Sequence, residues 1–169
     1  AAHDGLVVFA SAMASGLGVF NATSRTFLTV PISSTESKRK YCGATAAHNG
    51  LSSVIVFAPM REDAVGLFDP HTLSYSRVDS GQPGLSNQVA AAHNAWEHQC
   101  LRPCGDSQRD DLIDDKYWGA ATAANGLVVF APYKAPNVGV FDPVSGSFSV
   151  VDIESIAPPL MQHGRFRGA

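Results

Sequence analysis

The sequence has few charges, few cysteines and no long uninterrupted apolar run. Charged residues make up 16% of its 169 positions, with 12 basic and 15 acidic side chains and a formal net charge of −3. This balance argues against a nucleic-acid partner, because binding to nucleic acids favours a clearly basic surface. Hydrophobic residues make up 45%, which argues against a disordered chain and is enough for one domain with a core.

No segment has the pattern of a membrane-spanning helix or of a signal peptide. The longest nearly apolar stretch, residues 6–20, is interrupted by serine and glycine, whereas a spanning helix takes roughly 20 apolar residues. No basic segment precedes an apolar core, so no signal peptide is predicted. The chain begins at Ala1 instead of methionine. This favours a processed product, a trimmed chain or a fragment, and it leaves the cellular compartment open.

Three segments of the chain resemble one another, and this is the main signal for the fold. They are residues 1–30, 39–79 and 116–152. Each has small residues, an Asn-Gly or Asp-Gly pair, an apolar run that ends in Phe-Ala, a polar gap and a Gly-aliphatic-Phe step followed by a turn. A repeat of roughly 40 residues is typical of a β-propeller blade.

Each part of the repeat has a physical interpretation. The Asp4-Gly5, Asn49-Gly50 and Asn125-Gly126 pairs predict a tight hairpin turn with positive φ. The short apolar runs have the length of buried strands. Asp69-Pro70 and Asp142-Pro143 each end a strand, because proline cannot donate to a ladder. We therefore predict an all-β protein of about four repeats, each a four-stranded antiparallel blade of a β-propeller, with a β-sandwich as the alternative.

The predicted units are residues 1–38, 39–80, 81–115 and 116–158. The third is degenerate, because the pattern stops after Asn94; one hypothesis is that residues 95–111 are a frame-shifted version of an ordinary blade. Residues 165–169 match the start of an inner strand and so begin or close a further blade. Two interpretations stay open: a closed four-bladed ring, or a fragment of a larger propeller, which we favour.

Two motifs resemble the repeats of known propeller families. They are VGLFDPHTLSYSRVD at residues 65–79 and VGVFDPVSGSFSVVD at residues 138–152. They are similar to blades of the YVTN, NHL and virginiamycin-lyase type, which share an Asp-Pro step followed by a turn and an aromatic residue. The resemblance implies blade architecture. Such propellers range from lyases and lactonases to binding platforms, and no catalytic residue of these families can be matched to a position here.

Three histidines form the candidate site, since His3, His48 and His93 each precede the first turn of a unit. On a propeller they are expected at equivalent places near the axis, where three imidazoles can bind a divalent metal. The fourth unit has Asn125 before its glycine and no histidine. The alternative is that a residue suited to a strand end recurs with the repeat. No other cofactor is predicted.

Other clusters favour structural roles. Cys100 and Cys104, with His98, lack the second pair of ligands that a structural zinc site needs. Cys42 takes the place of Trp118 in the repeat, which predicts a small buried residue. Residues 38–40 are basic and are predicted to be a solvated connector. An acidic run is predicted to be a solvated linker and comprises Asp106, Asp110, Asp111, Asp114 and Asp115.

No nucleophile elbow, phosphate loop or zinc-protease motif is present. We therefore expect a non-enzymatic binding or scaffold module whose partners are other protein chains, such as a peripheral subunit of a larger assembly. The main alternative is a propeller enzyme of the lyase or lactonase type with a central, metal-dependent pocket. A third is binding of a carbohydrate or small ligand by the loops.

Overall fold

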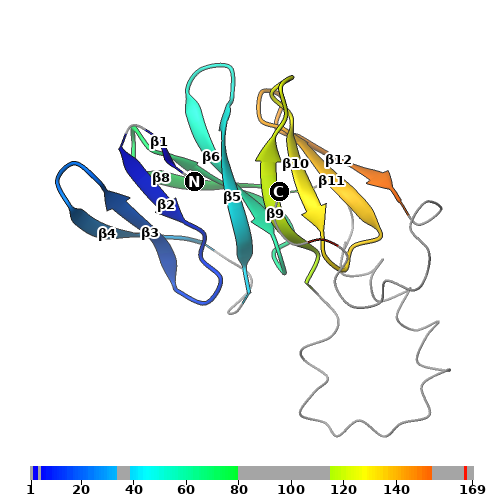
Figure 1. The fold of residues 1–169 in the computed structure, drawn as a ribbon, viewed down its shortest axis with the longest axis horizontal. Coiled ribbons are helices and arrows are strands. Elements are labelled where there is room, and N and C mark those ends of the chain that lie inside the picture. The colour runs from blue at the N-terminus through cyan, green and yellow to red at the C-terminus, as the bar shows by residue number, and fades with distance from the viewer. Residues whose placement is uncertain (1, 4, 34–38, 80–114, 154–165, 167–169) are drawn as a thin grey trace, which may run out of the picture.

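A computed structural model describes residues 2–3, 5–33, 39–79, 115–153 and 166. These residues form three four-stranded antiparallel sheets that follow one another across Figure 1. In each sheet the order of the strands is the order of the chain. The described part of the chain contains no helix of the length and apolarity needed to cross a membrane. The all-β prediction is thus confirmed for these residues; the predicted unit 81–115 lies outside them, except for Asp115.

Each sheet is formed by one of the three segments that resemble one another in sequence. The N-terminal sheet contains β1 (Ala2–His3), β2 (Leu6–Phe9), β3 (Gly16–Asn21) and β4 (Thr26–Pro31). The middle sheet contains β5 (Tyr41–His48), β6 (Ser53–Pro59), β7 (Ala64–Asp69) and β8 (Ser74–Asp79). The C-terminal sheet contains β9 (Tyr117–Thr122), β10 (Val128–Pro132), β11 (Asn137–Asp142) and β12 (Ser147–Asp152).

The glycines in the loops after the first strands have the predicted positive φ, but the loops differ in length. Gly5, Gly50 and Gly126 have φ of 77°, 89° and 86°. His3 pairs directly with Leu6 in a two-residue turn, whereas residues 49–52 and 123–127 form wider loops. The prediction of a tight turn therefore holds for the first sheet alone. In the middle sheet the Asn49 side chain accepts from the N–H groups of residues 51 and 52 at 3.0 and 2.8 Å, which stabilises the wider loop.

The Asp-Pro steps end strands as predicted. β7 ends at Asp69 and β11 ends at Asp142. Each aspartate then accepts from a turn N–H, that of His71 at 2.8 Å and that of Val144 at 2.9 Å. In the last strand of the C-terminal sheet, exposed residues alternate with half-buried ones up to Val150.

The middle sheet is covered on both faces. Ile55 and Phe57 on β6 are buried in a cluster with residues of the N-terminal sheet. Val54 and Val56, which alternate with them, are buried in a second cluster with residues of the C-terminal sheet. Successive side chains of a strand point to opposite faces, so a strand between two sheets is apolar throughout. This accounts for the uninterrupted apolar run at residues 54–58.

The first strands of the sheets lie side by side. β5 packs against β9 on one side and against β1 on the other. A Cβ atom added to Gly43 of β5 would lie 2.7 Å from the Cα atom of Gly119 in β9. The Thr122 hydroxyl donates to the Ala46 carbonyl at 2.6 Å. The small residues that the sequence gathers in this strand are therefore explained by close approach of two backbones.

Candidate functional site

His3 and His48 lie at strand ends, as the repeat predicts, but the structure describes little of the proposed metal site. His3 is the last residue of β1 and His48 the last residue of β5, two neighbouring strands. The His48 side chain is exposed, and its Nδ1 atom accepts from the N–H of Gly50 at 3.1 Å. His93 and the side chain of His3 lie outside the described residues. Among the side chains that the structure does describe, no three or more His, Cys, Asp or Glu residues form a metal-binding group.

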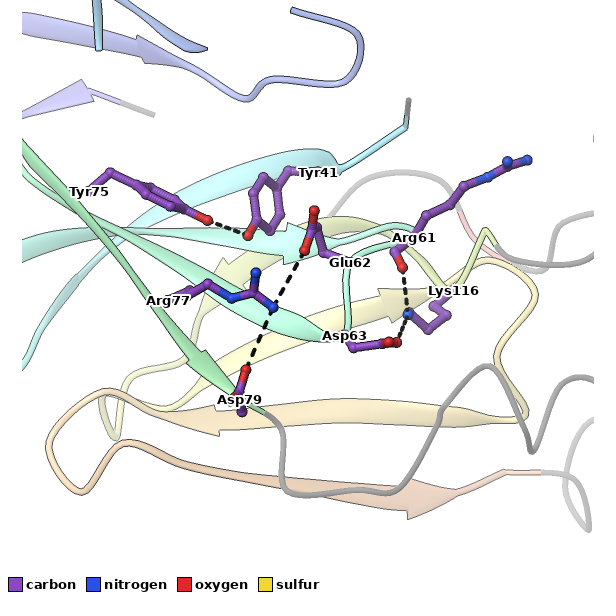
Figure 2. Close-up of polar contacts among 8 residues, drawn as sticks. All are labelled: Tyr41, Arg61, Glu62, Asp63, Tyr75, Arg77, Asp79 and Lys116. Carbon is purple, nitrogen blue, oxygen red and sulfur yellow. Dashed lines mark hydrogen bonds and ion pairs between the residues drawn. The ribbon is translucent and has the colours of Figure 1, made fainter. Parts of the chain in front are cut away.

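Two buried lysines directly precede the inner strands β5 and β9 and contact the preceding sheet. The Lys40 N–H donates to the Ala12 carbonyl at 3.1 Å, and the Lys116 N–H donates to the Met60 carbonyl at 2.8 Å. The ammonium groups reach the same two loops: Lys40 Nζ donates to Ala14 O at 3.1 Å, and Lys116 Nζ donates to Arg61 O at 3.1 Å (Figure 2). Each lysine thereby fastens its sheet to the loop between the second and third strands of the sheet before it.

An almost fully buried carboxylate links the same two junctions. Asp115 accepts from Arg39 Nη1 at 2.7 Å and from Arg61 Nε at 3.1 Å. Arg39 precedes β5 and Arg61 follows β6, so one carboxylate joins the starts of two inner strands through two charge-assisted hydrogen bonds. Lys116 adds an ion pair with the exposed Asp63 at 3.0 Å (Figure 2).

A third set of polar side chains belongs to the middle sheet and to its loop between β6 and β7. Glu62 is fully buried, and its Oε2 atom lies 3.8 Å from Arg77 Nη2, which also lies 3.6 Å from Asp79 (Figure 2). The hydroxyls of Tyr41 and Tyr75 share a hydrogen bond of 2.5 Å. Burial, together with that hydrogen bond, raises the pKa of Tyr41 far above its ordinary value, and burial also raises the pKa of Tyr75. Both phenols are therefore neutral at physiological pH.

Two predictions about charged segments are corrected at the residues that the structure describes; Lys38, Asp106, Asp110, Asp111 and Asp114 lie outside them. The basic connector and the acidic linker were expected to be solvated, but Lys40 is 5% exposed and Asp115 is 2% exposed. The reason is that residues just before an inner strand enter the junction with the preceding sheet. The sequence contains a signal for this, since Lys40 and Lys116 both directly precede the tyrosine that begins an inner strand. Cys42 is half-buried and not fully buried; its burial, and secondarily the charge of Asp115, raises the pKa of its thiol.

The apolar side chains of the outer sheets differ sharply in exposure. Phe9 and Phe27, on one face of the N-terminal sheet, are 50% and 62% exposed, and their ring centroids are 6.4 Å apart. Phe57 and Phe130 stand at the corresponding positions of the other two sheets and are fully buried. An exposed aromatic pair of this kind marks a surface suited to contact with another apolar surface.

No protein-family model matches the chain, and no curated protein matches it significantly. The functional argument therefore depends on the residues and on the geometry of the three sheets. Lys40, Lys116 and Asp115 contact neighbouring sheets, whereas Phe9 and Phe27 form an exposed aromatic pair.

Proposed function

We propose that the three sheets are blades of a β-propeller and that the protein is a non-enzymatic binding module for other protein chains. Successive sheets are joined in the same way at both junctions, through the main-chain bonds of Lys40 and Lys116. Phe166 extends the series, because its N–H donates to Pro132 O just as the Tyr41 N–H donates to Ser11 O. This supports a further blade that follows the C-terminal sheet.

One observation supports the binding role above all. The aromatic face of the N-terminal sheet is exposed at Phe9 and Phe27, whereas the equivalent faces of the other sheets are buried in apolar clusters. Burying apolar surface is the dominant favourable term in most protein association. The buried lysines and aspartate, in contrast, are engaged in contacts between sheets.

A capture experiment tests this role. The tagged chain is used as bait in an extract of its source, alongside the double variant Phe9→Ser, Phe27→Ser and the control Leu51→Ser. Leu51 is 93% exposed but lies in the loop between β5 and β6, away from the aromatic face. We expect proteins that the wild type and the control capture equally and that the double variant does not. Equal capture by all three baits, or by none, would contradict the proposed role.

The alternative function is a propeller enzyme with a metal at the histidine positions. It is favoured by the placement of His3 and His48 at the same ends of neighbouring strands. Elemental analysis of the purified chain, with and without a chelator and with His48→Ala as the comparison, decides between the two. Stoichiometric metal that depends on His48 would support the enzyme, as would a midpoint of thermal unfolding that falls when the metal is removed.

A further inference from the structure

The turn between the third and fourth strands has the same construction in all three sheets. It starts at the last residue of β3, β7 or β11, which is Asn21, Asp69 or Asp142. In each turn a side-chain oxygen of this residue accepts from the N–H two positions later, at 2.9, 2.8 and 2.9 Å. The N-terminal sheet therefore uses an asparagine amide where the other two sheets use a carboxylate.

The N-terminal turn differs from the other two at the three positions that define an acceptor for N-linked glycosylation. Such an acceptor has the sequence Asn-x-Ser/Thr, in which x is not proline. Residues 21–23 are Asn-Ala-Thr, whereas residues 69–71 are Asp-Pro-His and residues 142–144 are Asp-Pro-Val. Asparagine thus replaces aspartate, alanine replaces the excluded proline, and threonine supplies the hydroxyl. No other asparagine of the sequence has serine or threonine two positions later.

The acceptor segment is open to solvent. Asn21 is half-buried, and residues 22–24 are exposed at the tip of the hairpin formed by β3 and β4 (Figure 1). This exposure does not depend on which sheet carries the turn. In the middle sheet, which has a sheet on either side, the equivalent turn is half-buried at Asp69 and exposed at residues 71–74. A turn at this place in the fold therefore stays accessible when both faces of its sheet are covered.

The side-chain amide of Asn21 is oriented by its oxygen. Oδ1 accepts from the N–H groups of Thr23 and Ser24 at 2.9 and 3.0 Å, so Nδ2 is the amide atom turned away from the turn. Nδ2 donates to no residue that the structure describes, and the Thr23 hydroxyl likewise forms no hydrogen bond with a described residue. Both chemical groups of the acceptor are thus available to an enzyme.

We propose that Asn21 carries an N-linked oligosaccharide. The donor is an oligosaccharide attached to a lipid pyrophosphate. Its C1–O bond to the pyrophosphate breaks, a bond between C1 and Nδ2 of Asn21 forms, the lipid pyrophosphate leaves, and Nδ2 gives up one proton to a base of the transferase. Chains modified in this way enter the secretory route, so the proposal also assigns this protein to that route. It is independent of the binding role proposed above.

Mass spectrometry of the protein from its natural source tests the modification directly. Trypsin releases Asn21 in the peptide that ends at Arg25. We expect this peptide to be heavier by the mass of an oligosaccharide. Peptide N-glycosidase in heavy-oxygen water should remove this mass and convert Asn21 to a labelled aspartate.

Variants of the chain, secreted from eukaryotic cells behind a cleavable leader, separate the acceptor from the turn. Thr23→Ser keeps the hydroxyl and should keep the oligosaccharide, whereas Thr23→Val should lose it. The turn should still form in Thr23→Val, because Val144 stands at the equivalent position of the C-terminal sheet. Asn21→Asp should also lose the oligosaccharide and keep the turn, because Asp69 accepts the same hydrogen bond. Circular dichroism confirms that each variant is folded, and Thr23→Ala replaces Thr23→Val if the latter is not.

Three outcomes would overturn the proposal. The first is an Asn21 peptide from the natural protein that carries no oligosaccharide in any molecule. The second is an oligosaccharide that persists in Asn21→Asp, since the sugar would then be attached elsewhere. The third is equal glycosylation of Thr23→Ser and Thr23→Val, because the hydroxyl of the acceptor would then have no part in its recognition.

Discussion

Replacing Gly43 with alanine tests the close approach of the inner strands β5 and β9. Gly43 has φ of +91°, and an added Cβ would lie 2.7 Å from the Cα atom and 3.2 Å from the N atom of Gly119. Both atoms belong to the backbone of the neighbouring sheet, so no side-chain rotation relieves the overlap. The two sheets would have to move apart where they share an apolar cluster.

The expected loss of stability has two parts. The left-handed backbone conformation disfavours a Cβ atom by about 1–2 kcal/mol. Overpacking against a backbone that cannot rotate away adds about 1–3 kcal/mol. We therefore expect Gly43→Ala to lower the free energy of unfolding by about 2–5 kcal/mol, measured by urea denaturation followed by far-ultraviolet circular dichroism.

Gly126→Ala is the matched control for this substitution. Gly126 has φ of +86°, but a Cβ added there would meet no atom within 4 Å. The control therefore carries the backbone strain without the collision, and we expect a loss of about 1–2 kcal/mol. Equal losses for the two variants, at unchanged denaturant slope, would refute the close approach of β5 and β9.

Three further perturbations use the charged and phenolic groups. Asp115→Ala leaves two arginines without their buried carboxylate and should destabilise the fold by about 3 kcal/mol, whereas Asp79→Ala, at an exposed ion pair, should change stability by less than about 1 kcal/mol in the same urea assay. Burial raises the pKa of Tyr41 and of Tyr117 above that of a free phenol, so the stability they contribute is complete below about pH 10 and falls above it; ultraviolet titration that showed both phenols ionising normally in the folded protein would contradict this. Hydrogen bonds from a turn hydroxyl and a turn N–H lower the pKa of Asp142, so its contribution is complete above about pH 4 and is lost as the pH falls, which NMR titration against Asp142→Asn checks.

The features that could be predicted from the sequence depend on local geometry. An Asp-Pro step ends a strand wherever it stands, because the proline has no N–H and the aspartate accepts from the following turn. Asp69 and Asp142 therefore lie at predicted strand ends. The positive φ of Gly5 and Gly50 follows in the same way from the turns they occupy. Loop length could not be predicted, since the Asn49 side chain stabilises a wider loop, whereas His3 pairs directly with Leu6 at the Asp-Gly pair of the first sheet.

The burial of charged residues could not be predicted, because their partners are distant in the sequence. Arg39 binds Asp115 across 76 positions, and a basic cluster or an acidic run gives no indication of such a partner. The candidate site shows the same limit. The recurrence of His3 and His48 correctly predicts equivalent strand ends, but it does not reveal that His48 accepts a hydrogen bond from its own loop.

Val56 and Val129 are equivalent residues in sequence that differ in burial, so a comparison of them shows how the position of a sheet affects stability. Both stand in the second strand of a sheet, one residue before the phenylalanine that pairs with glycine. Val56 is fully buried against the C-terminal sheet, whereas Val129 is only half-buried. Val56→Ala should therefore lower the free energy of unfolding by about 2–3 kcal/mol, from two lost methyl groups and the cavity they leave. Val129→Ala should lower the free energy of unfolding by less than about 1 kcal/mol in the same urea assay, because the substitution removes less buried apolar surface. Equal losses for the two variants would contradict the difference in burial between Val56 and Val129.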